Sequence, residues 1–176
     1  MNQKTLHTLE FDKILSLLEE KAVSAPGKAL CRALEPMTEL GAIETAQAET
    51  EAALSRIRMK GELRLAGLRD VSASVKRLDV GGTLSTSELY AIGTLLDLSE
   101  RARNYGAHEE AEPDPDALEA SFTALSPLPK EKRELKRCVL SEELVADTAS
   151  AELSRIRRQM KTADERMHSA LQEEIN

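Results

Sequence analysis

Residues 81–98 read GGTLSTSELYAIGTLLDL, and this stretch indicates the fold class of the chain. The pair Gly81 and Gly82 is typical of a helix end, because glycine readily adopts the left-handed conformation that terminates helices. Ser85 stands three residues before Glu88, which is the spacing of a capping box, in which each side chain accepts a hydrogen bond from the other residue's backbone N–H. The sequence therefore predicts a helix that begins directly after Ser85.

The helix that follows this cap is apolar enough to form the centre of a core. Leu84 lies before the cap and is expected to contact Leu89 as a hydrophobic staple, which sets the direction of entry into the helix. Apolar residues then recur over about three turns and give the helix a broad apolar side. They are Leu89, Ile92, Leu95, Leu96 and Leu98.

The composition extends this prediction to the whole chain. Aromatic residues make up only 2% of the 176 residues, tryptophan is absent and charged residues reach 31%. Strands favour aromatic and β-branched side chains, whereas a chain rich in Leu, Ala and Glu favours helices. We therefore expect an all-α fold of several packed helices, with one short extended pair near residues 139–145.

Further helices are expected on both sides of the central one. Apolar spacing and capping residues indicate helices over about 8–22, 24–35, 38–57, 70–78, 118–125 and 130–138. Ser24, Thr38 and Asp70 are the expected N-caps of three of these helices. Pro26 fits the first turn that follows Ser24, because the first helical N–H groups have no partner inside the helix.

The last helix is expected to start at Ser150, a preferred N-cap residue, and to run to Asn176. Its apolar residues recur at intervals of 3, 4, 3 and 4, which is the seam of a coiled coil rather than a broad globular face. We call this set the seam: Leu153, Ile156, Met160, Ala163 and Met167. A helix about 39 Å long at ~1.5 Å per residue should project from the body.

We therefore divide the chain into a helical core domain, residues 1–146, and the start of a projecting helix, residues 147–176. Neither glycine nor proline ends this helix, and Glu173 and Glu174 lie where a helix end would prefer cations. The expectation is a helix interrupted before its end, whose seam awaits a partner helix.

A local basic run on this helix leaves three interpretations open. Arg155, Arg157, Arg158 and Lys161 could form a solvated helix face, contact nucleic-acid phosphates, or pair with acidic groups such as those of residues 109–116. The net charge of −7 repels polyanions, no aromatic or glycine-rich element accompanies the run, and successive arginines spread around a helix. The solvated face is therefore the simplest interpretation.

No set of residues converges on a site for chemistry. His7, His108 and His168 are far from one another and from Cys31 and Cys138 in the sequence, so no metal-type spacing occurs. We therefore expect no catalytic, cofactor-binding or metal-binding residues, and no enzyme activity in this chain. Two distant cysteines and the lack of a signal peptide or an apolar run of ~18 to 20 residues favour a cytoplasmic protein without membrane contact.

Four stretches of the sequence, taken in order, resemble the N-terminal region of bacterial endonuclease MutS type two, the paralogue of the mismatch-repair MutS ATPase. They are TLHTLEFDKILSLLEEKA (5–22), GKALCRALEPMT (27–38), LAGLRDVSASVKRLDVGGTLSTSELYAI (65–92) and DTASAELSRIRRQM (147–160). Their most specific parts are Gly67-Leu68-Arg69-Asp70, Gly81-Gly82 with Leu84-Ser85, and Ala149-Ser150 with Glu152-Leu153 leading into Arg155-Ile156-Arg157-Arg158. The family usually has a proline where this chain has Ala151.

The resemblance implies a MutS-type core domain followed by the lever helix that leads to a nucleic-acid clamp. In that family a dimerising ATPase domain, which binds ATP and Mg²⁺, and a small Smr nuclease domain follow later, and residues 1–176 hold none of these parts. Full-length members are linked to suppression of homologous recombination, binding of branched DNA and rescue of collided ribosomes, which involves rRNA binding. The implied partners are the missing clamp and ATPase domains, a second copy in a homodimer, and branched DNA or a collided ribosome.

Two functions follow from this reasoning. In the first, the chain is a non-catalytic core and lever that links ATPase state to clamp position. In the second, it is a free-standing helical adaptor or oligomerisation module that uses the seam for self-association. The occupant of the seam distinguishes them, because the first requires a returning helix of the same protein and the second requires another copy of the chain.

Overall fold

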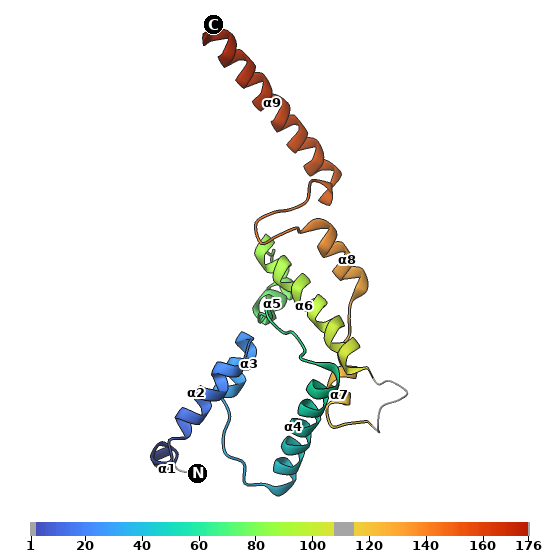
Figure 1. The fold of residues 1–176 in the computed structure, drawn as a ribbon. Coiled ribbons are helices and arrows are strands. Elements are labelled where there is room, and N and C mark those ends of the chain that lie inside the picture. The colour runs from blue at the N-terminus through green and yellow to red at the C-terminus, as the bar shows by residue number, and fades with distance from the viewer. Residues whose placement is uncertain (1–2, 108–114, 176) are drawn as a thin grey trace.

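In the computed structural model, which describes residues 3–107 and 115–175, the fold is all-α, as the composition predicted (Figure 1). The β-type pairing within these residues is an isolated antiparallel bridge between Val139 and Val145, at the position of the expected extended pair. The helices are α1 (Gln3–Thr8), α2 (Phe11–Lys21), α3 (Ala25–Arg32), α4 (Leu40–Lys60), α5 (Ser72–Asp79), α6 (Thr86–Gly106), α7 (Glu119–Thr123), α8 (Pro129–Cys138), the 3₁₀ turn η1 (Asp147–Ala149) and α9 (Ala151–Ile175).

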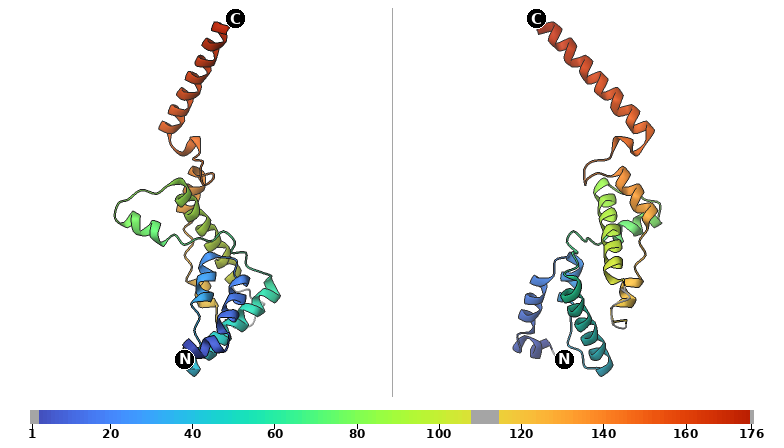
Figure 2. Two further views of the ribbon diagram at one scale, coloured as in Figure 1. Left: turned by 90° about the vertical axis from the view of Figure 1, so that its left-hand side faces the viewer. Right: turned by 45° about the vertical axis from the view of Figure 1, so that its right-hand side comes forward.

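The helices form an elongated body from which the last one projects. Helices α2 and α3 pack against each other near the N-terminus, and α6 runs through the middle of the body with α7 and α8 packed on it. Helix α9 leaves the body at the end opposite to the N-terminus, and Figure 2 shows it clear of the other helices from two further sides. The expected projection of the last helix is therefore present, although Asn176 lies outside the described residues.

Three of the expected helix starts are displaced. At the one expected from Asp70, the N-cap of α5 is Val71, and the Asp70 carboxylate accepts the Ser72 N–H at 2.9 Å. The helix expected from residue 8 begins at Phe11, because Glu10 adopts the left-handed conformation, with φ 55°, and separates α1 from α2. The N-cap of α4 is Glu39 rather than Thr38: its carboxylate accepts the N–H groups of Gly41 and Ala42 at 3.0 and 2.7 Å. The helix therefore begins one residue later than expected, and the Glu39 side chain satisfies two of its first N–H groups.

The turn between α5 and α6 forms the capping box described above. Ser85 Oγ accepts the Glu88 N–H at 3.3 Å, and Glu88 Oε2 accepts the Ser85 N–H at 2.9 Å. The other carboxylate oxygen of Glu88 accepts from the Ser74 hydroxyl at 2.9 Å and forms an ion pair with Arg77. Glu88 therefore both caps α6 and ties α5 to its start.

The apolar core is small. Buried apolar side chains come mainly from small residues, and Leu98 of α6, at 3% exposed, is the largest of them. The buried set of apolar residues is Ala52, Leu98, Ala102, Val139 and Ala146. Many large apolar side chains of α2, α4 and α9 are exposed instead. Polar contacts between helices therefore carry an unusual share of the packing.

The strongest of these contacts is centred on Arg56 of α4, which is only 8% exposed. Its Nε and Nη2 atoms donate to the two carboxylate oxygens of Asp116 at 2.5 and 2.9 Å, a bidentate pair. Its Nη1 atom donates to the carbonyl oxygen of Gly106 at 3.3 Å. The guanidinium carbon also lies 5.0 Å from the centre of the Phe122 ring, within cation–π range. One side chain thus joins α4, the end of α6 and α7.

The end of α6 is shaped to receive these contacts. Gly106 is buried against Phe122, and a Cβ atom at this position would overlap the Phe122 side chain. Tyr105 stacks edge-on against Phe122 with 5.9 Å between ring centres, and its hydroxyl donates to the carbonyl of Gly61 at 2.9 Å. The C-terminal ends of α4 and α6 are therefore fixed side by side.

We expect Asp116→Asn to lower the free energy of unfolding by about 1–3 kcal/mol, because the buried Arg56 loses its charged acceptor. Urea titration followed by circular dichroism measures this change. The matched control is Glu142→Gln, which removes a carboxylate whose ion pair with Arg69 is exposed on both sides, and which should change stability by less than about 0.5 kcal/mol. Equal effects of the two substitutions would contradict the role given to Arg56.

The same pair should make stability depend on pH. The hydrogen bonds from Arg56, opposed in part by burial, hold the pKa of Asp116 below its ordinary value. Its contribution is therefore fully present above the unfolded-state pKa of about 3.9 and is lost as the pH falls through the lower folded-state pKa. Urea titrations across this range should show the difference between the wild type and Asp116→Asn shrinking in acid. A difference independent of pH would show that the charge of Asp116 is not its cause.

Candidate functional site

The base of α9 is built by a short segment, residues 139–150, which we call the junction. The Val139–Val145 bridge closes a tight loop in which the Leu140 N–H donates to Leu144 O at 2.9 Å and the Ala146 N–H donates to Cys138 O at 2.8 Å. The η1 turn follows, and Ser150 Oγ then accepts the Leu153 N–H at 3.1 Å at the start of α9. Since Val139 and Ala146 are buried, the junction is anchored in the body.

Two arginines hold the junction from opposite sides. Arg137 of α8 donates to the carbonyl oxygens of Thr148 and Ala149 at 2.6 and 3.3 Å. Its guanidinium also forms an ion pair with the Glu134 carboxylate at 2.5 Å. The Arg137 hydrogen bond keeps the pKa of Glu134 below its ordinary value. Arg137 thus ties the turn that precedes α9 back onto α8.

Arg157 completes the junction from the α9 side. Its Nη1 atom donates to the carbonyl oxygen of Val145 at 2.8 Å and also forms an ion pair with Asp147. Arg157 is therefore engaged within the chain, and its role as a nucleic-acid contact stays a prediction. Its acidic partner lies in the junction, whereas Asp116 of the acidic stretch pairs with Arg56 and residues 108–114 lie outside the described residues.

The other members of the basic run remain at the surface. Arg155 and Arg158 are exposed, and the Lys161 ammonium lies 4.0 Å from Glu165 with its side chain 80% exposed. The seam is exposed as well: Met160 is 65% and Met167 56% accessible, Ile156 and Ala163 are exposed, and only Leu153 near the junction is half-buried. Helix α9 therefore presents both its apolar seam and its cations to solvent.

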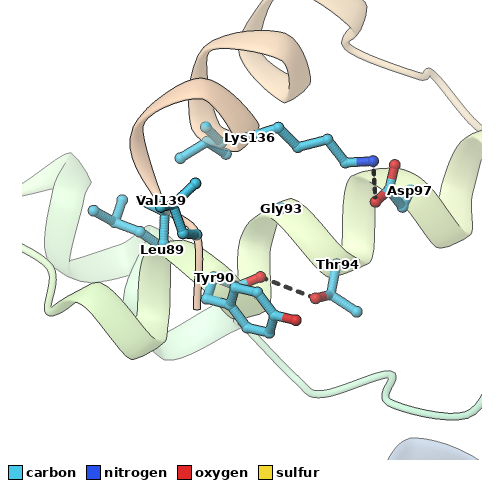
Figure 3. A pocket seen from close by; sticks show the side chains of 9 residues that line it. Leu89, Tyr90, Gly93, Thr94, Asp97, Lys136 and Val139 are labelled. Carbon is cyan, nitrogen blue, oxygen red and sulfur yellow. Dashed lines mark hydrogen bonds and ion pairs between the residues drawn. The ribbon is translucent and has the colours of Figure 1, made fainter. Parts of the chain in front are cut away.

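A groove of about 380 Å³ lies between α6 and α8, next to the junction (Figure 3). Its apolar part comes from both helices and from the junction, and its polar part includes an ion pair between Lys136 and Asp97 at 2.7 Å. The lining residues are Leu89, Tyr90, Gly93, Thr94, Asp97, Leu135, Lys136, Val139 and Leu140. Lys132 lies 3.4 Å from the same Asp97 and also pairs with Glu100.

These charges hold α8 on α6. Partial burial raises the pKa of Asp97, but the hydrogen bonds and positive charges of Lys136 and Lys132 outweigh it and leave the pKa below its ordinary value. The Glu100 hydrogen bond in turn raises the pKa of Lys132. Asp97 is therefore a charged structural contact rather than a group poised to exchange protons near neutral pH.

Within the residues that the structure describes, no three His, Cys, Asp or Glu side chains are grouped to hold a metal ion. His168 lies near Asp164 on α9, His7 lies on α1, and His108 falls outside the described residues. Cys31 and Cys138 are half-buried free thiols. The described geometry joins one long helix to the body through the junction and the hydrogen bonds of Arg137 and Arg157.

The sequence did not indicate the contacts that Arg56, Lys136 and Arg137 make with other segments of the chain. Each of these residues acts on a segment that its own helix does not contain, so neither spacing nor capping patterns indicate them. The one available signal was the run of cations in α8, which includes both Lys136 and Arg137 and whose partners could not be assigned.

Comparison with known proteins gives a consistent set of relatives. The chain is 39% identical over all of its 176 residues to Endonuclease MutS2 of Agathobacter rectalis, of which it covers 22%. It is 38% identical over its whole length to Endonuclease MutS2 of Lachnoclostridium phytofermentans, covering 23%, and 34% identical over 98% of its length to that of a Geobacillus species, covering 22%. The chain thus spans about a fifth of the length of these relatives.

No protein-family model matches the chain. In the described part of the chain, no helix combines the length and the apolar character that crossing a membrane requires.

We expect Arg137→Met to loosen the junction while leaving the body folded, because the carbonyls of Thr148 and Ala149 lose their donor. Hydrogen exchange followed by mass spectrometry should show exchange at least about threefold faster for the amides that join η1 to α9. Arg133→Met, an exposed position on the same helix, is the control and should leave these amides unchanged. Unchanged exchange in Arg137→Met would show that the bridge alone holds the junction.

Proposed function

The chain is a homologue of Endonuclease MutS2 proteins over its full length, and from this premise we propose that it forms the non-catalytic core and lever region of such a protein. The observation that carries the proposal is the junction. It joins the helices of the elongated body to one long projecting helix through directed hydrogen bonds from Arg137 and Arg157. An arrangement of this kind transmits orientation and needs no catalytic residues of its own.

The lever mechanism follows from the length of α9. The helix is about 37 Å long at ~1.5 Å per residue, so a rotation of about 10° at the junction moves its far end by about 6 Å. The base of α9 contacts α8 through the junction, and α8 contacts α6 through the Lys136–Asp97 pair. A shift of α6 or α8 would therefore reach the end of α9 as a larger displacement.

We further propose that the remaining activities belong to other parts of the whole protein. These are ATP hydrolysis with Mg²⁺, cleavage of nucleic acid, homodimer formation and the engagement of branched DNA or a collided ribosome by the clamp. The present chain would supply the coupling between an ATPase and a nucleic-acid clamp. In this proposal the seam of α9 packs against a helix that returns from that clamp.

A chimera tests the coupling role. In the Agathobacter rectalis protein, the matching fifth is replaced by this chain, and ATP hydrolysis is measured with and without branched DNA. We expect the chimera to hydrolyse ATP and to respond to DNA. Arg137→Met should abolish the response while preserving basal hydrolysis, whereas Arg133→Met should preserve both. Retention of the DNA response in Arg137→Met would contradict the lever mechanism.

The exposed seam also favours a second candidate function, that of a free-standing adaptor that self-associates. If the seam awaits a helix of its own protein, the 176-residue chain should sediment mainly as a monomer at micromolar concentration in analytical ultracentrifugation. Met160→Glu, in the seam, and Thr162→Glu, outside it, should then leave sedimentation unchanged. A tight dimer that Met160→Glu dissociates and Thr162→Glu does not would favour the adaptor.

A further inference from the structure

The cations of α9 lie together on the side of the helix opposite the seam. At 3.6 residues per turn, Arg155, Arg158, Lys161 and Arg166 fall within an arc of about 140° that is centred about 170° from the centre of the seam and that also includes Glu165. We call these four residues the basic face. Arg157, which would break this grouping, is turned to the junction and bound there. The tertiary structure therefore separates the arginines of the run. Arg157 binds the junction, and Arg155 and Arg158 belong to the basic face.

The basic face is available for an outside partner. All four residues are exposed, and within the described residues the carboxylate nearest to any of them is Glu165, 4.0 Å from Lys161 and itself 65% exposed. Water screens a pair of this kind strongly. The hydroxyl of Thr162, which lies between the cations, donates to the backbone carbonyl of Arg158, and that of Ser169, just beyond Arg166, donates to the carbonyl of Glu165. A helix packed on the seam would leave this side uncovered.

We propose that the basic face binds the phosphate backbone of a nucleic acid while the seam packs against another helix. The inference rests on the proposed function and deepens it, because it gives the core and lever region its own contact with nucleic acid.

The chemistry of the face fits phosphates. Three of its four cations are arginines, whose planar guanidinium groups bind phosphate oxygens in bidentate fashion. The residues extend over about 16 Å along a helix whose diameter of about 10–12 Å suits the major groove of duplex DNA, which is about 12 Å wide. Since the whole chain carries a net charge of −7, this cluster is a local exception and not part of a general positive charge.

The same face fits other anionic partners less well. An acidic polypeptide would need apolar or aromatic anchors at the centre of its interface, and the positions between the cations are Thr162 and Glu165, which are polar and acidic. A membrane-surface helix buries a strongly hydrophobic face, rich in side chains such as Trp, Phe and Leu, in the lipid. The seam is instead a narrow stripe that includes Ala163 and holds no aromatic residue, which suits a neighbouring helix better than lipid.

Fluorescence anisotropy of a short labelled DNA duplex tests the proposal with the 176-residue chain. At about 50 mM salt we expect measurable binding. The logarithm of the association constant should fall with the logarithm of the salt concentration with a slope of about −3 to −4, because each of four contacted phosphates contributes about −0.9. The variant Arg155→Glu/Arg158→Glu/Arg166→Glu should lose at least about tenfold in affinity and flatten the slope by about 2.7. Circular dichroism checks that the variant keeps its helix content, and Arg155→Lys/Arg158→Lys/Arg166→Lys should retain most of the binding.

The matched control is Arg58→Glu/Arg64→Glu/Arg133→Glu, which makes the same change in net charge at three exposed arginines on other parts of the chain. It should lower affinity by less than about threefold. Equal losses in both triple variants, or no wild-type binding at low salt, would overturn the proposal. Competition by poly-glutamate as strong as that by unlabelled DNA would overturn it in favour of an acidic polypeptide. These outcomes leave the chimera's ATPase response untouched, so failure of the basic face is distinguishable from failure of the lever.

Discussion

The buried guanidinium of Arg56 is the contact on which the body of this protein depends. It donates hydrogen bonds to Asp116 and to the last carbonyl of α6, and it lies over the Phe122 ring. It therefore joins α4 to the end of α6, 50 residues away in the chain, and to Asp116, 60 residues away. With so few large apolar side chains buried, no hydrophobic cluster could replace this alignment. Once α6 is fixed, Asp97 and Glu100 on its surface position α8 through Lys132 and Lys136. Helix α8 in turn holds the junction through the hydrogen bonds of Arg137.

This sequence of contacts has a physical consequence for stability. Apolar burial is insensitive to direction, whereas bidentate and carbonyl-directed hydrogen bonds from arginine fix orientation. A body held mainly by such contacts can be small and still direct a long helix accurately. It is correspondingly sensitive to the loss of a single charged partner, because a buried charge left unpaired costs more than the pair contributes.

Helix α9 combines two different surfaces on one rod. The seam is apolar and narrow, which suits one neighbouring helix, and the basic face lies on the other side and carries exposed cations. A helix arranged in this way can be held by its own protein on one side and contact a polyanion on the other. Among the relatives of the chain are proteins named Endonuclease MutS2, a name that describes cleavage of nucleic acid by those proteins.

The sequence by itself determined the features that depend on near neighbours. The capping box of Ser85 and Glu88, the Ser150 start of α9, the all-α class and the 3, 4 spacing of the seam all involve residues within about one or two turns, whose geometry a helix dictates. Glu39 is the cap in place of Thr38, because the carboxylate of a longer side chain also reaches the first free N–H groups of a helix. Only the tertiary structure decided which charges meet. The Arg56–Asp116 pair spans 60 residues, and the division of the α9 arginines between junction and basic face depends on where the chain turns before the helix begins, which no local pattern encodes.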